Sequence, residues 1–350
     1  MLSAFIMVAP PESFRASAKP RAKLDLPLVV GPPIRIVPVI IPSMYLLGFC
    51  MEYVLTLIGA PAANAVSKNF VARAGVALDK AGARVDDTTW LAAGIAADIS
   101  FHDVDWTRGF DGVVAELSGE PIDIAIQRPD HRKKCLLVAD MDSTIIGQEC
   151  LDELADLAGL GTHVTKLTAR AMAGEIDFAE ALRERVKMLA GISETLLQQT
   201  FDKRVTLNPG ARTLVKTMAA NGAITALVSG GFQFFTSRVA DAAGFGSFGG
   251  NLFEIENGVL TGRITGDIVG AEAKQTTLEA LMAEHDIPAE LTMATGDGAN
   301  DIPMLKTASL GVAMRPKPVV RDAANVTIDH GDLTALLFVQ GYTPADFVET

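Results

Sequence analysis

Acidic side chains follow the apolar run at residues 136–139 in a pattern that can carry chemistry. Asp140 and Asp142 stand one residue apart directly after this run, which reads as a buried strand. Two like charges at the end of a buried strand are costly to desolvate unless a cation compensates them, and a hard ion such as Mg2+ prefers oxygen ligands. The alternative is a solvated turn in which one Asp caps the next helix.

A second acidic segment, GDGAND at residues 296–301, follows another apolar run near residues 291–295. Asp301 taken alone would be a helix cap, because Asp is common at helix N-termini. The acidic residues after the run at residues 136–139, in the same predicted sheet, favour a shared ligand site over a simple cap. We predict that Asp140 and Asp297 share one cation, with Asp301 behind them as an outer-shell acceptor.

Two further segments offer groups that suit an anion. Ser229 and Gly230 follow the apolar run at residues 224–228, and a hydroxyl, bare backbone N–H groups and a helix N-terminus together form an anion site. An ordinary helix cap by Ser229 is the competing interpretation, and the same geometry serves both. Lys274 lies near the start of a predicted helix, where a cation opposes the helix dipole by ~0.3–1 kcal/mol, so an anionic neighbour is expected unless it is a surface lysine.

These four segments, in this order, resemble the motifs of the haloacid dehalogenase superfamily of phosphohydrolases over about residues 136–330. The motif residues are Asp140-Met141-Asp142-Ser143-Thr144, Ser229-Gly230, Lys274 and Gly296-Asp297-Gly298-Ala299-Asn300-Asp301. The resemblance implies that Asp140 is the nucleophile and forms an aspartyl-phosphate, and that Asp142 is the general acid and base. It also implies that Mg2+ is held by Asp140, the Asp142 carbonyl oxygen and Asp297.

The chemistry of phosphate ester hydrolysis calls for the same residue types. A carboxylate is a weak nucleophile, so it needs a phosphate whose charge is neutralised, which Mg2+, Lys274 and the Ser229 segment can do. An alkoxide is a poor leaving group unless it is protonated, so a carboxylic acid must lie nearby. We therefore predict Lys274 and Ser229 to be catalytic alongside Asp140 and Asp142.

The helical pattern at residues 145–208 is inserted directly after the predicted nucleophile and should form a cap over the site. Glu149 could face an ammonium group, or it could be an acidic residue in a first helical turn. Arg185 shares a helix face with Phe178 and two leucines. It either extends its charged end from the edge of that face or binds a carboxylate bidentately.

An ammonium site and a carboxylate site above a phosphatase site indicate a phosphorylated amino acid. The positions of Glu149, Arg185, Met172 and Phe178 resemble the substrate-binding positions of superfamily members that act on O-phospho-L-serine, with Ser229, Gly230, Lys274 and Asn300 on the phosphate side. We predict Mg2+-dependent hydrolysis to L-serine and phosphate, the last step of L-serine biosynthesis. The alternatives are a phosphotransferase acting on an alcohol such as homoserine, or an amino-acid-responsive regulatory protein.

The elements that position these residues fall into two domains. Residues 130–350 alternate short apolar runs with amphipathic helices, which predicts an α/β, Rossmann-like parallel sheet with the helical cap. Residues 51–129 predict a smaller α+β domain of order βαββαβ. This order resembles the ACT-type amino-acid-sensing domain. It would act as a scaffold, bind a regulator or form a homodimer. The expected elements are strands at 53–58, 84–91, 93–101 and 122–126, and helices at 62–80 and 106–117.

Composition limits the partners and the setting of the 350-residue chain. Its 42 acidic and 30 basic residues give a net charge of −12, which argues against nucleic acid or an anionic membrane as a partner. Its three cysteines form no CxxC pair, so we expect a reducing cytoplasm. Prolines and Arg35 interrupt the apolar stretch at residues 28–54, so no transmembrane helix is expected. Residues 1–50 hold 8 of the 17 prolines, which predicts a poorly ordered extension.

Overall fold

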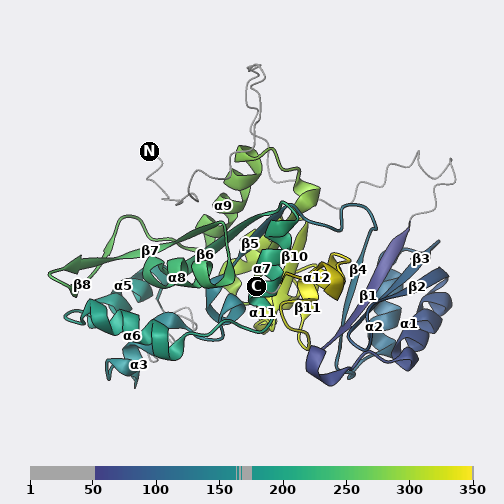
Figure 1. Ribbon diagram of the computed structural model, residues 1–350, viewed down its shortest axis with the longest axis horizontal. Helices are drawn as coiled ribbons and strands as arrows, with labels where there is room; N and C mark the ends of the chain where they lie inside the picture. The colour runs from purple at the N-terminus through teal and green to yellow at the C-terminus, as the bar shows by residue number, and fades with distance from the viewer. Residues whose placement is uncertain (1–51, 163, 165–166, 168–175, 349–350) are drawn as a thin grey trace, which may run out of the picture.

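The computed structural model describes residues 52–162, 164, 167 and 176–348. It contains two sheets, each in its own α/β region, which lie side by side (Figure 1). The predicted extension at residues 1–50 and the predicted substrate residue Met172 lie outside the described residues.

The N-terminal region is an antiparallel four-stranded sheet of order β2-β3-β1-β4, with α1 and α2 packed on one face (Figure 1). The central strand β1 is buried along its whole length, whereas the edge strand β2 is largely exposed. The predicted order βαββαβ is confirmed. The elements are β1 (Tyr53–Gly59), α1 (Lys68–Ala81), β2 (Arg84–Ala92), β3 (Ala96–His102), α2 (Trp106–Glu116) and β4 (Ile122–Gln127).

The first helix of this region begins later than predicted. The chain passes through a 3-10 turn (Pro61–Ala63) and a left-handed Asn64, and α1 starts only after Ser67. The Ser67 hydroxyl accepts a hydrogen bond from the Phe70 N–H at 3.3 Å, as expected of an N-cap residue. The start at residue 62 was therefore wrong, because the alanines before the cap have helical propensity but no cap.

The C-terminal region is built on a seven-stranded sheet of order β11-β10-β9-β5-β6-β7-β8, parallel except for β8. The predicted α/β class with a parallel sheet is confirmed. Its strands are β5 (Leu136–Ala139), β6 (Ile224–Phe232), β7 (Ser247–Glu256), β8 (Val259–Thr265), β9 (Thr292–Gly296), β10 (Leu310–Met314) and β11 (Val326–Ile328). Its helices are α7 (Ala211–Ala220), α8 (Gln233–Ala243), α9 (Ala271–Glu284), α10 (Ile302–Thr307), α11 (Pro318–Arg321) and α12 (Ala335–Val339).

Helices cover both faces of this sheet because successive residues of β5 point to opposite sides. Leu136 and Val138 pack in a cluster with residues of α9 and α10, such as Leu278. Leu137 and Ala139 pack in the other cluster with residues of α7, α8 and α12. A strand buried on both faces explains why the sequence at β5 is apolar without alternation.

The segment inserted after β5 contributes α3 (Cys150–Leu157), α5 (Phe178–Met188) and α6 (Glu194–Arg204) (Figure 1). The insertion enters and leaves the sheet region at one place, where Ile146 bridges Leu207 and the Asn208 amide donates to the Thr144 carbonyl at 2.7 Å. Asp177 caps α5 by accepting from the Glu180 N–H at 2.9 Å. No helix in the described ranges is long and apolar enough to cross a membrane.

Candidate active site

The order of the parallel strands brings three predicted site segments to one edge of the sheet. Ala139 of β5 pairs with Thr295 of β9 on one side and with Leu227 of β6 on the other. Asp140 follows Ala139 directly, and Asp297 and Ser229 each follow two residues after these partners. The three side chains therefore leave neighbouring strands at the same end, where ligands of such sheets bind.

Three buried carboxylates and one lysine form the centre of this edge. Carboxylate oxygens of Asp140, Asp297 and Asp301 lie within 4.8 Å of one another. The Lys274 Nζ atom, on α9, lies 2.6 Å from Asp140 Oδ1 and 2.6 Å from Asp301 Oδ1. Lys274 is fully buried, so the solvated-turn interpretation of Asp140 and the surface interpretation of Lys274 are both wrong.

The ionisation of these groups follows from burial and mutual charge. Burial and the neighbouring charge of Asp301 hold the pKa of Asp140 well above its ordinary value, although Lys274 opposes them. Burial alone would lower the pKa of Lys274, but the carboxylates of Asp140 and Asp301 raise it above its ordinary value. Lys274 is therefore a permanent cation at the base of the site.

Asp301 is fixed by hydrogen bonds to both of its oxygens. Its Oδ1 accepts a hydrogen bond from Lys274 Nζ. Its Oδ2 accepts from the backbone N–H groups of Asp297 at 3.1 Å and Gly298 at 2.9 Å. A Cβ at Gly296 would overlap the Asp301 carboxyl group, so a glycine is required for this close approach. The side chain of Asp301 therefore accepts from backbone N–H groups that precede it in the chain, in the turn that carries Asp297.

This donor set fits a divalent cation. Three buried carboxylates face a single buried ammonium group, which leaves an excess of negative charge, and every side chain that offers a ligand atom offers oxygen. Such a set suits a hard ion. Because both Asp301 oxygens already have partners, Asp140 and Asp297 are the carboxylates that could bind an ion directly.

Asp142 lies in a tight turn, Met141–Ile145, that returns its side chain to the site. Asp142 itself is extended and Ser143 is left-handed at φ 56°, so the chain reverses within two residues. Asp142 Oδ1 accepts from the Cys150 N–H at 2.8 Å, and Oδ2 accepts from the Ser229 hydroxyl at 3.0 Å. Burial raises the pKa of Asp142 above its ordinary value, although these hydrogen bonds oppose the shift.

The Ser229 segment differs from its predicted form. Strand β6 continues through residues 229–231 to Phe232, and Phe232 rather than Ser229 is the N-cap residue of α8. The helix-cap interpretation of Ser229 is therefore wrong. Its hydroxyl accepts from the Gly231 N–H at 2.8 Å while it donates to Asp142. The added Cβ of a residue at Gly231 would lie 3.1 Å from Asp142 Oδ2, so this glycine permits the contact.

The inserted helices place the predicted recognition residues above this edge. Glu149 precedes α3 and accepts from the Ser143 hydroxyl at 2.8 Å. Partial desolvation and the charge of Asp142 raise the pKa of Glu149, which is nevertheless accessible to solvent. The exposed Phe178 ring of α5 covers Gly230, where an added Cβ would lie 3.1 Å from the ring.

Arg185 lies largely buried between two helices of the insertion. Its Nη2 atom contacts Asp152 Oδ1 of α3 at 2.6 Å, a partner that the sequence analysis did not identify. Its buried Nε has no hydrogen-bond partner among the described residues. Arg185 thus retains an unused donor.

Two further residues lie on the loops beyond β9 and β10. Asn300 is exposed, and its side-chain oxygen folds closely against Gly298. Lys317, which the sequence analysis missed, places its Nζ atom 3.4 Å from Asp297 Oδ2. The rule that ligands bind beyond strand ends could have found Lys317, because it follows β10, the neighbour of β9.

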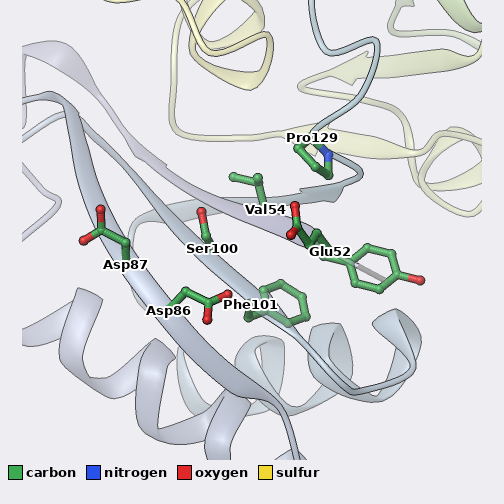
Figure 2. A pocket seen from close by; sticks show the side chains of 8 residues that line it. Glu52, Val54, Asp86, Asp87, Ser100, Phe101 and Pro129 are labelled. Atoms are coloured by element: carbon green, nitrogen blue, oxygen red, sulfur yellow. The ribbon is translucent and has the colours of Figure 1, made fainter. Parts of the chain in front are cut away.

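A separate pocket of about 340 Å3 lies in the N-terminal region (Figure 2). Carboxylates line it at Glu52, Asp86 and Asp87, beside Ser100 and Phe101. These negative charges would repel a phosphate, and the pocket lies in a different sheet from Asp140. The strand ends of the larger sheet are therefore the candidate active site.

Comparison with known proteins agrees with this geometry. Residues 137–306 match the family model of haloacid dehalogenase-like hydrolases. A phosphoserine phosphatase of Idiomarina loihiensis is 44% identical over 202 residues, which are 58% of this chain and 91% of that relative. The chain therefore belongs to the haloacid dehalogenase-like hydrolases. Within that class, it is a member of the phosphoserine phosphatase family.

Two other relatives extend the comparison. A phosphoserine phosphatase of Archaeoglobus fulgidus is 44% identical over 217 residues, and the match spans 62% of this chain and 62% of that relative's length. The structure of a probable phosphoserine phosphatase from Vibrio cholerae has a TM-score of 0.67 at 29% identity, covering 85% of this chain and 88% of that one. The match to the Vibrio cholerae structure covers more residues than the C-terminal region contains, so it also includes part of the N-terminal region with the smaller sheet.

Proposed function

We propose that this protein hydrolyses O-phospho-L-serine to L-serine and phosphate through a phosphorylated Asp140. The observation that carries the proposal is the contact of buried Asp140 with Lys274 at 2.6 Å, beside a separate Asp142–Ser229 pair. Asp140 is thereby placed against a fixed cation, whereas Asp142 is held apart from that cation by hydrogen bonds from neutral donors. The membership in the phosphoserine phosphatase family supports the same reaction.

In the first step, an Asp140 carboxylate oxygen attacks phosphorus and the bond to the serine oxygen breaks. Protonated Asp142 gives its proton to that leaving oxygen, a role that its raised pKa supports. Lys274 and the hydrogen-bond donors near Ser229 and Gly230 would neutralise the phosphate oxygens. In the second step, the Asp142 carboxylate takes a proton from water, which attacks phosphorus and releases Asp140 and phosphate.

We propose Mg2+ as the cation of the acidic cluster, held by the carboxylates of Asp140 and Asp297 and by the Asp142 carbonyl oxygen, with Asp301 in the outer shell. When bound, Mg2+ would neutralise charge on the phosphate and so make phosphorus a better electrophile. Its all-oxygen donor set supports this assignment over a softer metal.

For the amino-acid part of the substrate, we propose that Glu149 binds the ammonium group and Arg185 the carboxylate. The unused Nε of Arg185 supports its role, because a carboxylate could accept from Nε and a terminal nitrogen together. Phe178 and Met172 would pack against the substrate, and Asn300 would contact the phosphate. Helices α3, α5 and α6 would form the cap that excludes water.

The remaining sequence predictions belong to the same proposal. We assign residues 51–129 as an ACT-like domain and residues 130–350 as the catalytic domain, with its cap at about residues 145–208. The charge of −12 supports a small-molecule substrate rather than nucleic acid or a membrane. Cytoplasmic location in the L-serine pathway and assembly as a homodimer are further parts of this proposal.

A phosphate-release screen tests the proposed function. Purified protein is incubated with phosphoserine, phosphothreonine and a sugar phosphate, each with Mg2+ and with a chelator. We expect phosphoserine to be preferred, activity to require Mg2+, and Asp140→Asn to abolish turnover. Activity retained by Asp140→Asn would refute the covalent mechanism. Transfer of phosphate to added homoserine, detected by product analysis, would favour the phosphotransferase instead.

A further inference from the structure

A buried carboxylate of the N-terminal domain binds backbone amides of the catalytic domain. Asp123, on β4, is only 4% exposed. It accepts from the N–H groups of Asp329 at 2.8 Å, His330 at 3.1 Å and Gly331 at 2.7 Å. These donors belong to the loop that follows β11, so Asp123 fixes the conformation of a loop in the other domain.

That loop is bonded in turn to the chain segment that follows β10. The Gly331 carbonyl accepts from Arg315 Nη2 at 2.8 Å, and the Arg315 N–H donates to the Ile328 carbonyl at 2.8 Å. Arg315 adopts a left-handed conformation at φ 40°, which costs a non-glycine residue about 1–2 kcal/mol. Contacts outside the turn must therefore hold it in place.

The same turn reaches the active site two residues later. The Lys317 N–H donates to the Asp297 carbonyl at 3.0 Å, and Lys317 Nζ lies 3.4 Å from Asp297 Oδ2. Hydrogen bonds connect β4 to Arg315 through Gly331, the backbone connects Arg315 to Lys317, and Lys317 contacts Asp297.

We infer that Asp123 is a positioning residue for Asp297, acting across the domain boundary through the turn at residues 315–317. The N-terminal domain is then a structural part of the active site, in addition to any role in binding a regulator. This inference rests on the proposed function only in the assignment of Asp297 as a metal ligand.

A second polar contact between the domains provides a matched control. Asp98, on β3, accepts from Arg132 Nη1 at 2.7 Å, and Arg132 Nη2 donates to the Val339 carbonyl at 3.1 Å. This contact ends at the C-terminus of α12 and does not include the turn at 315–317. Asp98→Asn should loosen the domain contact without releasing Asp297, whereas Asp123→Asn should do both.

Amide hydrogen exchange in the presence of a chelator tests the inference without metal or substrate. Asn at position 123 turns an NH2 group toward backbone donors, so we expect peptides containing Lys317 to exchange about tenfold faster in Asp123→Asn. Asp98→Asn should match the wild type in these peptides. Unchanged exchange in Asp123→Asn, or equal acceleration in Asp98→Asn, would overturn the inference.

Arg315→Met tests the middle of the pathway at an exposed position, where misfolding is not expected. It should accelerate exchange at Lys317 as Asp123→Asn does, and the double variant should add little, because both remove the same connection. Calorimetric titration with Mg2+ should show binding weakened about 2- to 30-fold in each variant. Additive exchange effects would overturn the inference. If the wild-type protein releases no phosphate, the proposed function is refuted. The exchange measurement still decides whether Asp123 positions Asp297.

Discussion

Replacing Lys274 by methionine should remove the one buried cation that two carboxylates share. Lys274 Nζ lies 2.6 Å from an oxygen of Asp140 and 2.6 Å from an oxygen of Asp301, and all three side chains are buried. Methionine keeps an unbranched apolar chain of similar length, so the substitution mainly removes charge. Breaking a buried ion pair by removing one partner costs about 3–5 kcal/mol, and we expect a loss of that size at pH 8.

The size of this loss should depend on pH with a defined sign. The raised pKa of Lys274 means that its stabilising contribution in the wild type is present throughout the range from pH 5 to 8. In Lys274→Met the pKa of Asp140, already raised by burial, rises further. The folded variant therefore takes up protons as the pH falls, and the destabilisation should shrink from pH 8 toward pH 5.

Urea unfolding followed by circular dichroism, in a chelator, measures both effects. The control is Lys134→Met, because Lys134 is also buried but donates to neutral acceptors, the Glu290 carbonyl at 2.7 Å and the Ser309 hydroxyl at 3.0 Å. Burial lowers the pKa of Lys134 to about 8. Its removal leaves no carboxylate unpaired, so we expect a loss of about 1 kcal/mol or less. Equal, pH-independent losses in the two variants would refute the reasoning.

Three other substitutions test separate parts of the site. Asp142→Asn should lower phosphate release about 10²- to 10⁴-fold, since it removes the proposed acid, and a loss below tenfold would contradict that role. Arg185→Ala should lower kcat/KM for phosphoserine about a hundredfold more than for an aryl phosphate; equal losses would exclude carboxylate recognition. Gly296→Ala should destabilise by about 1–3 kcal/mol in urea, whereas Gly75→Ala, with open space around its Cβ, should not.

The sequence was sufficient to predict the sheet edge because parallel strands impose geometry on whatever follows them. Once residues 136–139 and 292–296 are buried neighbours, Asp140 and Asp297 must leave at one end. The extent of β6 was harder to predict. Its glycines indicate a turn, but the strand continues to Phe232 and pairs with Asn251 of β7 across an irregularity in register. That pairing depends on a partner strand, which local propensity does not describe.

Contacts between polar residues that lie far apart in the sequence could not be predicted, for a related reason. The helical period placed Arg185 on the apolar face of α5, but it could not identify Asp152 of α3 as its partner. Residues 129–134 are polar in sequence, as expected of a linker between two domains. In the structure, Lys134 is buried and Arg132 is partly buried, and both are bonded to groups more than 30 residues away in sequence, including Asp98 and the Glu290 carbonyl. Side-chain type predicts that a charge needs a partner, but not which one.

The same distinction explains how the net charge of −12, from which we predict no nucleic-acid partner, is compatible with a phosphate substrate. Long-range attraction depends on charges that solvent and salt screen over about 8–10 Å, whereas the buried edge of the sheet responds to groups in direct contact. There the carboxylates of Asp140, Asp297 and Asp301 outnumber the single buried ammonium of Lys274. Lys317 beside Asp297 offsets only part of this excess, so we expect the cluster to repel a dianionic phosphate until a bound cation neutralises it. The acidic cluster that makes the site negative is therefore also the reason that we expect the proposed hydrolysis to require a metal.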